Sequence, residues 1–392
     1  MNHLFKKGFL FNGQIPFFLI VCAVSAPLLV VLSSWFTPVD DIFIHLLKTG
    51  LPDVLMNTVL LLLGVAIGTT ILGVSLASLT ATFEFPGRSL FDWALILPLA
   101  IPTYILAFVS ISLFDRIGLV QDFLRSQGSD FLLPPIRSTG GVILVMTLAL
   151  YPYVYLFARN GFQTQGMRAT EVARSLGQSP FVTFFRVVLP MGSPMIASGL
   201  MLVLMETLAD FGAVSIFNYD TFTTTIYKAW FSMFSLSAAA KFSSLLVLLV
   251  FILVIAEQAA RQRRRYTTAE RQPAPMVRVI LTGRRRYAAS AYCTLILLFA
   301  FIIPVSELLR GASADLGQDL DTRYLGFLTR SLLLAAMATL LITASALLLV
   351  YAGRSVSAFK TGFLVRFATL GYALPGTILA VGGMMMVTFI DH

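Results

Sequence analysis

Two carboxylates in an apolar stretch are the residues best placed for chemistry. Glu206 and Asp210 are spaced i, i+4 within the apolar segment 194–217, so on a helix they would share one face. A charge at the centre of a membrane helix costs about 2.5–3.5 kcal/mol on insertion scales, so such acids suggest a function. One interpretation has both line a polar path that attracts a cation. The other places Asp210 near the outer interface and pairs Glu206 with Lys241.

The sequence predicts no catalytic residues and no metal site in this chain. It has no G-x-x-x-x-G-K-[ST] loop for nucleotide phosphates, no G-x-S-x-G elbow and no H-E-x-x-H helix. Cys22 and Cys293 each fall in an apolar stretch and are expected to be packing residues. The three histidines are too scattered to form a ligand cluster.

The composition is that of a polytopic membrane protein. Hydrophobic residues make up 57% of the chain and charged residues 12%, with a mean hydropathy of +0.85. A run of roughly 20 apolar residues spans a bilayer as a helix, so the expected fold is all-α. The nine expected spans are 15–36, 54–79, 90–114, 138–158, 194–217, 236–257, 288–309, 327–351 and 363–390.

The net charge of +9 is concentrated in alternate loops. Loops 159–190 and 261–287 are rich in arginine, so the positive-inside rule places them and the N-terminus in the cytoplasm. The short loop 81–89 carries only Glu84 and Arg88, so its cytoplasmic side follows only from the number of spans that precede it. Polybasic segments beside a membrane commonly contact anionic lipid, so the lipid bilayer is favoured over nucleic acid as the partner of 261–287.

Residues 168–190 predict two short amphipathic helices outside the bilayer. Apolar residues recur in the first at i, i+3, i+4 and i+7, and Gly177 can end it in a left-handed conformation. The second begins with Ser179 as N-cap and Pro180 at its first position, and Pro190 is expected to stop it. On periodicity alone, a loop resting on lipid headgroups is an equally good interpretation.

The spacing of particular residues in this segment adds a resemblance. It is similar to the EAA loop of the permease subunits of binding-protein-dependent ABC importers, with conservative departures at Val172 and Val187. The resemblance implies a type I ABC importer permease fold, whose cytoplasmic helix pair docks on an ATPase subunit. ATP and Mg would then be bound by a partner ATPase dimer, with no cofactor in this chain. The matching positions are Glu171, Ala173, Gly177, Val187, Leu189 and Pro190.

An offset of 273 residues relates two parts of the chain. It superimposes the start of the second expected span, at Asn57, on that of the eighth, at Arg330, and places Pro102 on Pro375. We interpret this as an internal duplication, although two unrelated apolar stretches could align by composition. Pro102 and Pro375 are expected to kink helices around a translocation path.

The duplication predicts a domain plan. Residues 1–260 would form a first permease domain with its coupling loop at 159–190, 261–287 a basic cytoplasmic linker, and 288–392 the start of a second permease domain. The second coupling loop would fall beyond His392. The chain therefore looks like a tandem permease that stops inside its second half.

Two further stretches, 206–212 and 220–230, resemble the fused ferric-iron importer permeases. This implies Fe³⁺ as substrate and a periplasmic binding protein that delivers it. It also implies that the chain is a multi-pass protein of the bacterial inner membrane. Thiamine and phosphonate permeases share the fused layout and remain alternatives. A secondary transporter, which also uses repeats and broken helices, and an inactive fragment are the other hypotheses.

Overall fold

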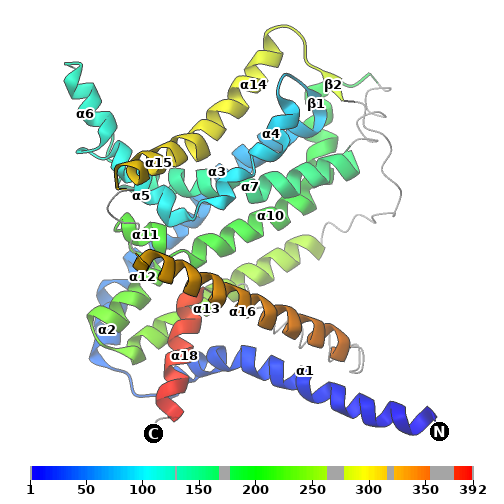
Figure 1. The fold of residues 1–392 in the computed structure, drawn as a ribbon, viewed down its shortest axis with the longest axis vertical. Coiled ribbons are helices and arrows are strands. Elements are labelled where there is room, and N and C mark those ends of the chain that lie inside the picture. The colour runs from blue at the N-terminus through cyan, green and yellow to red at the C-terminus, as the bar shows by residue number, and fades with distance from the viewer. Residues whose placement is uncertain are drawn as a thin grey trace. The chain divides into compact units, whose positions relative to one another are not determined.

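The computed structural model describes residues 2–128, 130–166, 177–262, 278–315, 322–353 and 375–390. Helices dominate these residues, with a single pair of two-residue strands (Figure 1). The elements are α1 (Asn2–Ser33), η1 (Ser34–Phe36), α2 (Asp41–Thr49), α3 (Leu51–Thr82), β1 (Phe83–Glu84), α4 (Arg88–Ala94), η2 (Leu97–Ala100), α5 (Thr103–Phe114), α6 (Leu119–Ser126), α7 (Thr139–Gly161), η3 (Phe162–Gly166), α9 (Pro180–Thr183), η4 (Phe184–Val188), α10 (Leu189–Ala209), α11 (Gly212–Ile216), α12 (Phe222–Tyr227), η5 (Lys228–Ser232), α13 (Leu236–Gln262), β2 (Val279–Ile280), α14 (Arg284–Leu297), η6 (Leu298–Ile302), α15 (Ile303–Asp315), α16 (Thr322–Gly353) and α18 (Gly376–Ile390).

Eight helices within the described ranges are long and apolar enough to cross a membrane. The predicted all-α architecture is confirmed. The ninth expected span, 363–390, lies partly outside the described residues, and its described part is the shorter apolar helix Gly376–Thr388. Because a bilayer offers the backbone no hydrogen-bond partners, helices satisfy it internally.

The prediction of one continuous span over 90–114 is wrong. Helix α4 ends at Ala94, the short helix η2 follows, and α5 starts only at Thr103. Pro98 and Pro102 account for the break, because proline lacks an N–H and disfavours a helical conformation in the residue before it. Pro102 has an extended backbone (φ −55°, ψ 142°), so it lies at a break between helices and not at a kink within one.

The contacts between elements divide the chain into two units. Unit 1 contains Met1–Phe43, Ala229–Val247 and Leu309–His392, and unit 2 contains Ile44–Lys228 and Leu248–Leu308. The boundaries of these units do not coincide with those of the two predicted permease domains, 1–260 and 288–392. In unit 1, α1 packs on α16 and α18, whereas in unit 2, α14 packs on α4, and η6 packs on η2 and α7 (Figure 1). The first span of each predicted half therefore contacts helices of the other half.

The core of unit 2 is α7, which packs between α3 and α10. A Cβ on Gly73 of α3 would lie 2.9 Å from the backbone N of Tyr155, and one on Gly199 of α10 would lie 3.0 Å from Cα of Val154. Glycine at both positions thus lets two helix backbones approach the same turn of α7. The side chains of Tyr151 and Tyr155 are fully buried there.

We predict that Gly73→Leu destabilises unit 2. The new side chain would meet α7 backbone that cannot move aside, and overpacking of this kind costs about 1–3 kcal/mol. Gly326→Leu on α16 is the matched control, because a Cβ there meets nothing within 4 Å. Thermal unfolding of the detergent-solubilised protein measures both. Equal melting temperatures for the two variants would contradict the tight contact.

Candidate coupling segment and transport path

Two of the six predicted coupling residues, Glu171 and Ala173, lie outside the described residues. Gly177 is described and has φ +77°, so the predicted left-handed conformation is confirmed. A Cβ on Gly177 would meet nothing within 4 Å. Only the backbone conformation, and no crowding, therefore favours glycine at this position.

The start of the second amphipathic helix is confirmed. The Val182 N–H donates to Ser179 Oγ at 3.4 Å and the Thr183 N–H donates to the Ser179 carbonyl at 2.9 Å. Helix α9 begins at Pro180. Ser179 therefore caps the helix, and proline occupies a position whose N–H needs no partner.

The prediction that Pro190 stops this helix is wrong. Helical backbone continues from α9 through the wide turn η4 into α10, which extends to Ala209. In η4 the Leu189 N–H donates to the carbonyl of Phe184, five residues back. The wider turn gives the proline ring room beside the carbonyls of the preceding turn, so the helix passes through Pro190 into the membrane span.

An aromatic contact joins residues near the two ends of the predicted coupling loop 159–190, which is called the coupling segment below. The buried Phe162 of η3 packs edge to face against Phe184 of η4, with ring centroids 5.9 Å apart. The same ring lies against Gly192 of α10, where a Cβ would be 2.7 Å from Phe162 Cε1. Of the predicted docking residues, Val187 and Leu189 are half-buried. Pro190 is exposed.

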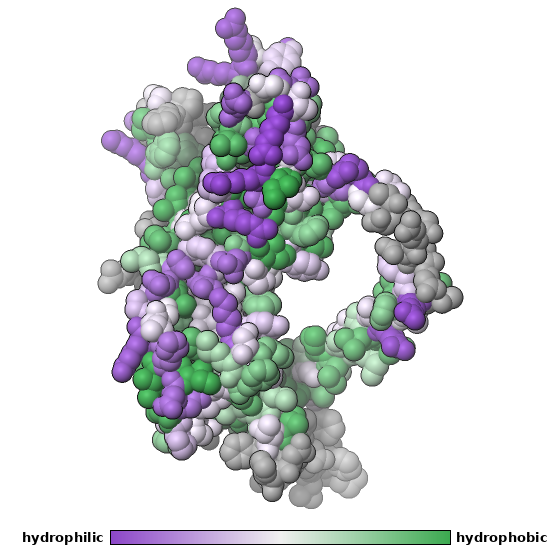
Figure 2. Space-filling model, turned by 90° about the vertical axis from the view of Figure 1, so that its left-hand side faces the viewer, coloured by the Kyte–Doolittle hydropathy of each residue, from purple (hydrophilic) through white to green (hydrophobic). Residues whose placement is uncertain are grey.

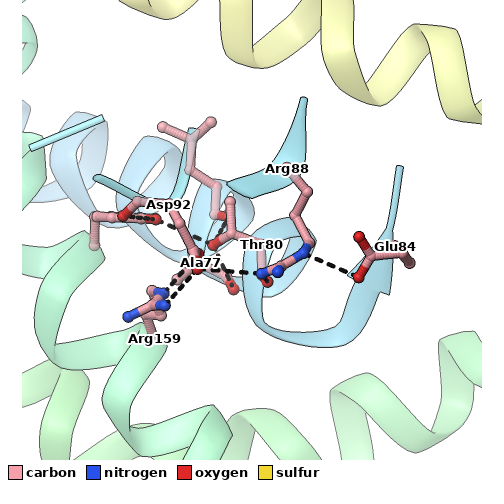
Figure 3. A network of polar contacts seen from close by, with 8 residues as sticks. Ala77, Thr80, Glu84, Arg88, Asp92 and Arg159 are labelled. Atoms are coloured by element: carbon pink, nitrogen blue, oxygen red, sulfur yellow. Dashed lines mark hydrogen bonds and ion pairs between the residues drawn. The ribbon is translucent and has the colours of Figure 1, made fainter. Parts of the chain in front are cut away.

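An ion-pair network anchors the end of α7, where the predicted coupling loop 159–190 begins (Figure 3). Arg159 contacts Asp92 of α4 with two nitrogens, Nε at 3.0 Å from Oδ1 and Nη2 at 2.8 Å from Oδ2. Arg88 joins the same carboxylate at 3.1 Å and reaches Glu84 of β1 at 3.0 Å. Bidentate arginine–carboxylate contacts fix orientation as well as distance, so α7 is tied to α4 and β1.

A buried tyrosine extends this network into the membrane span. The Tyr155 hydroxyl lies 3.2 Å from both Thr80 Oγ1 of α3 and the carbonyl of Asp92. The sequence analysis missed the whole network. Its local signal was the spacing of Glu84, Arg88 and Asp92, which places neighbouring opposite charges four residues apart.

The two short strands bring a predicted loop beside the predicted linker. Strand β1 pairs in parallel with β2, and the Leu281 N–H donates to the Glu84 carbonyl at 3.0 Å. The Ser290 hydroxyl also donates to the carbonyl of Pro86 at 2.7 Å. Loops 81–89 and 278–283 therefore lie on the same side of the membrane, as the parity argument requires.

The two acids predicted for the transport path do not share a helix face. Helix α10 ends at Ala209, and Asp210 has an extended backbone with ψ 125°. Its Oδ1 accepts from the N–H groups of Ala213 and Val214 at 2.9 and 3.2 Å, which caps α11. Its Oδ2 accepts from the Thr103 hydroxyl, at the start of α5. Asp210 thus ties together the ends of three helices.

Glu206 is half-buried in α10, and the structure offers Lys241 other partners. The ammonium of the fully buried Lys241 donates to the carbonyl of Pro38 at 3.0 Å, to Ser237 Oγ at 2.9 Å and to Thr37 Oγ1 at 3.3 Å. All four residues belong to unit 1. These oxygens satisfy the three donors of the ammonium, so pairing with Glu206 is not needed to explain the burial of Lys241.

Each of the two prolines related by the sequence offset lies directly before a helix. Pro102 precedes α5 and Pro375 precedes α18. The carbonyl of Pro102 accepts from the Ile105 N–H at 3.0 Å, and that of Pro375 accepts from the Ile378 N–H at 3.0 Å. Helices α3 and α16, which precede them, are each 32 residues long. The equivalence supports an internal duplication.

No group of three or more His, Cys, Asp or Glu side chains that could hold a metal ion occurs among the residues that the structure describes. The acids of the candidate path are used as helix caps or stand singly. The geometry therefore offers polar positions along membrane helices without a resident ion site in the described part of the chain.

We predict strong coupling between Asp92 and Arg159. Their side chains are 21% and 25% exposed, so the pair is neither fully exposed nor fully buried. A double-mutant cycle with alanine should therefore give a coupling energy of about 1–3 kcal/mol, between the values typical of exposed and of buried ion pairs. Thermal or denaturant unfolding in detergent measures the cycle. The exposed pair of Arg125 and Asp122 is the control and should couple by about 0.5 kcal/mol or less. Equal coupling in both pairs would contradict the anchoring role.

Comparison with known proteins places these features in a family. Residues 69–266 match the model of the binding-protein-dependent transport system inner membrane component. The Fe(3+)-transport system permease protein FbpB 2 of Haemophilus influenzae is 29% identical over 341 residues, 86% of this chain and 63% of the relative. The chain thus spans less than two thirds of that relative's length.

Two further relatives match shorter parts. The sulfate transport system permease protein CysT of Salmonella typhimurium is 30% identical over 144 residues, 37% of this chain and 50% of the relative. The molybdenum transport system permease protein ModB of Mycobacterium bovis is 30% identical over 123 residues, 31% of this chain and 45% of the relative. The family match covers half of the chain and includes the coupling segment, which agrees with the predicted type I permease fold. The chain belongs to the binding-protein-dependent transport system inner membrane components, a family of ABC importer permeases.

Proposed function

We propose that this chain is a transmembrane subunit of an ATP-driven importer that carries ferric iron across the bacterial inner membrane. A periplasmic binding protein would deliver Fe³⁺, and a dimer of ATPase subunits holding ATP and Mg would drive transport. The N-terminus would lie in the cytoplasm. The observation that carries the proposal is the match to the H. influenzae Fe(3+) permease, because it covers 86% of the chain and so extends beyond the family segment.

The structure suggests how an ATPase could move the spans. A force on the coupling segment would reach α10 through Phe184 and Gly192, which contact Phe162, and α7 through Arg159. Helix α10 has 21 residues and is therefore about 30 Å long. Asp210, directly after its far end, caps α11 and accepts from α5. Movement at one membrane surface is thereby linked to the broken helices at the other.

Glu206, Pro102 and Pro375 remain proposals for the transport path. Glu206 lies one turn before the end of α10, and each proline begins a helix directly after a break. Broken helices in transporters expose backbone groups that can contact a substrate, which is why we assign the path to this end of the spans.

Sulfate or another oxyanion is the second candidate substrate. The sulfate permease of Salmonella typhimurium has an identity similar to that of the iron permease but matches only 37% of the chain. An oxyanion would favour positive groups in the path, whereas Fe³⁺ would favour carboxylates such as Glu206. The charge of the residues that face the path would therefore help to distinguish Fe³⁺ from an oxyanion as the substrate.

Reconstitution with partner subunits tests the proposed substrate. We expect proteoliposomes that contain this chain and its ATPase to hydrolyse ATP faster when an Fe³⁺-loaded binding protein is present on the membrane side opposite the ATPase. The same binding protein without iron, and a sulfate-loaded binding protein, are the controls. If only the sulfate-loaded binding protein stimulated hydrolysis, the substrate would be an oxyanion and not Fe³⁺. Failure of the ATPase to co-purify would reject the importer proposal itself.

Gly177 provides a test of the coupling role. We predict that Gly177→Val reduces stimulated ATP hydrolysis and transport while membrane insertion is unchanged. The backbone conformation at φ +77° costs a β-branched residue about 1–2 kcal/mol. Gly177→Asn should retain activity, since asparagine tolerates this conformation. Gly128→Val is the matched control, with φ +73° and no atom within 4 Å of the added Cβ, but outside the coupling segment. Normal transport by Gly177→Val would contradict the role.

A further inference from the structure

A pocket of about 430 Å³ lies in unit 2 between α5, α7 and the loop that joins α6 to α7. Phe114 of α5, Leu133 of the loop, Leu144 and Leu148 of α7 and Phe299 of η6 contribute to its apolar lining. None of these residues takes part in the coupling segment or in the contacts of Asp210. The pocket is therefore separate from the features that carry the proposed function.

The part of the pocket that runs along α7 has about the length of one membrane leaflet. Its lining on α7 extends from the N-cap Ser138 to Leu148, a rise of about 15 Å along the helix. The hydrocarbon core of a bilayer is about 30 Å thick, so this distance is half of it. Leu144 and Phe299 are 55% and 42% exposed, so the pocket opens sideways on the surface of membrane-spanning helices. An aliphatic chain lying along α7 would fit this shape and lining.

Two arginines lie next in sequence to residues near the end of the pocket where α7 begins, although neither lines the pocket itself. Arg137 directly precedes Ser138, and its Nε contacts Asp115 at 2.9 Å while its Nη1 donates to the Ile216 carbonyl at 3.2 Å. Its side chain is about half exposed, and Arg116 beside Asp115 is exposed. Arg116 and Arg137 thus flank Asp115 near this end of the pocket, and Asp122 and Arg125 of α6 pair with each other. Figure 2, which faces the side of the molecule with α6, shows hydrophilic side chains among apolar ones on that surface.

We propose that this pocket binds one phospholipid with an anionic headgroup. One acyl chain would lie in the pocket along α7, and the headgroup would contact Arg137 and Arg116 where α7 leaves the hydrocarbon core. The lipid would touch both α7 and Phe299, so it would bridge the first permease domain and the seventh span. The inference rests on the membrane location of the family and does not depend on which substrate is transported.

Photolabelling tests the acyl-chain part of the proposal. The whole chain is placed in nanodiscs of phosphatidylcholine with a small fraction of phosphatidylglycerol that carries a diazirine in one acyl chain. We expect labelled peptides from 139–148 well above those from α3, where Ile67 and Ile71 are exposed but do not line this pocket. Leu144→Trp should remove the excess, and Ile67→Trp, the matched control, should leave it. Equal labelling of α7 and α3, or no change in Leu144→Trp, would overturn the proposal.

Competition tests the headgroup part. Unlabelled phosphatidylglycerol should displace the probe better than phosphatidylcholine, by about fivefold for each arginine involved. Arg116→Gln should reduce this preference, and Arg137→Lys, which keeps the positive charge, should retain it. Melting temperatures confirm that both variants fold. Equal competition by the two lipids in the unmodified chain would overturn the assignment of an anionic headgroup.

Discussion

The close approach of α3 and α10 to one turn of α7 is the constraint on which unit 2 depends. Gly73 and Gly199 meet the backbone at Val154 and Tyr155 from two helices, and no side chain could replace them without moving a helix axis. Because membrane helices are not driven together by the hydrophobic effect, small residues that allow close packing must supply the association. The buried tyrosines then place their hydroxyls on Leu95, Thr80 and Asp92, so the same contact positions the charged network beside the coupling segment.

The charged residues in or near the spans have mainly structural partners. Asp210 caps α11 and accepts from the Thr103 hydroxyl at the start of α5, Asp92 holds Arg159, and Lys241 is satisfied by neutral oxygens. Each is fixed by several hydrogen bonds, which offsets the cost of removing a charge from water. Hydrogen bonds to neighbouring helices therefore hold the segments between α4 and α5 and after α10.

The parts of the fold that sequence could predict are those set by local chemistry. Span positions follow from apolar length, Gly177 adopts the left-handed conformation that its type allows, and Ser179 caps the helix before which it stands. Pro190 was misjudged because its effect depends on the wide turn before it, which no single residue signals. The pair of Arg159 and Asp92 was missed because 67 residues separate them, and only the packing of α7 on α3 and α4 brings them together.

The crossed packing of the first spans has a consequence for biosynthesis. Helix α1 is synthesised well before its partners α16 and α18, and a Cβ on Gly382 of α18 would lie only 2.4 Å from the carbonyl of Pro27. At about 5–20 residues per second, roughly 15–60 s pass before α16 is complete. During that time α1 lies in the bilayer without the packing that α16 and α18 later provide. Its apolar composition is thus suited to two environments, first the bilayer as an isolated helix and later a helix-packed interior.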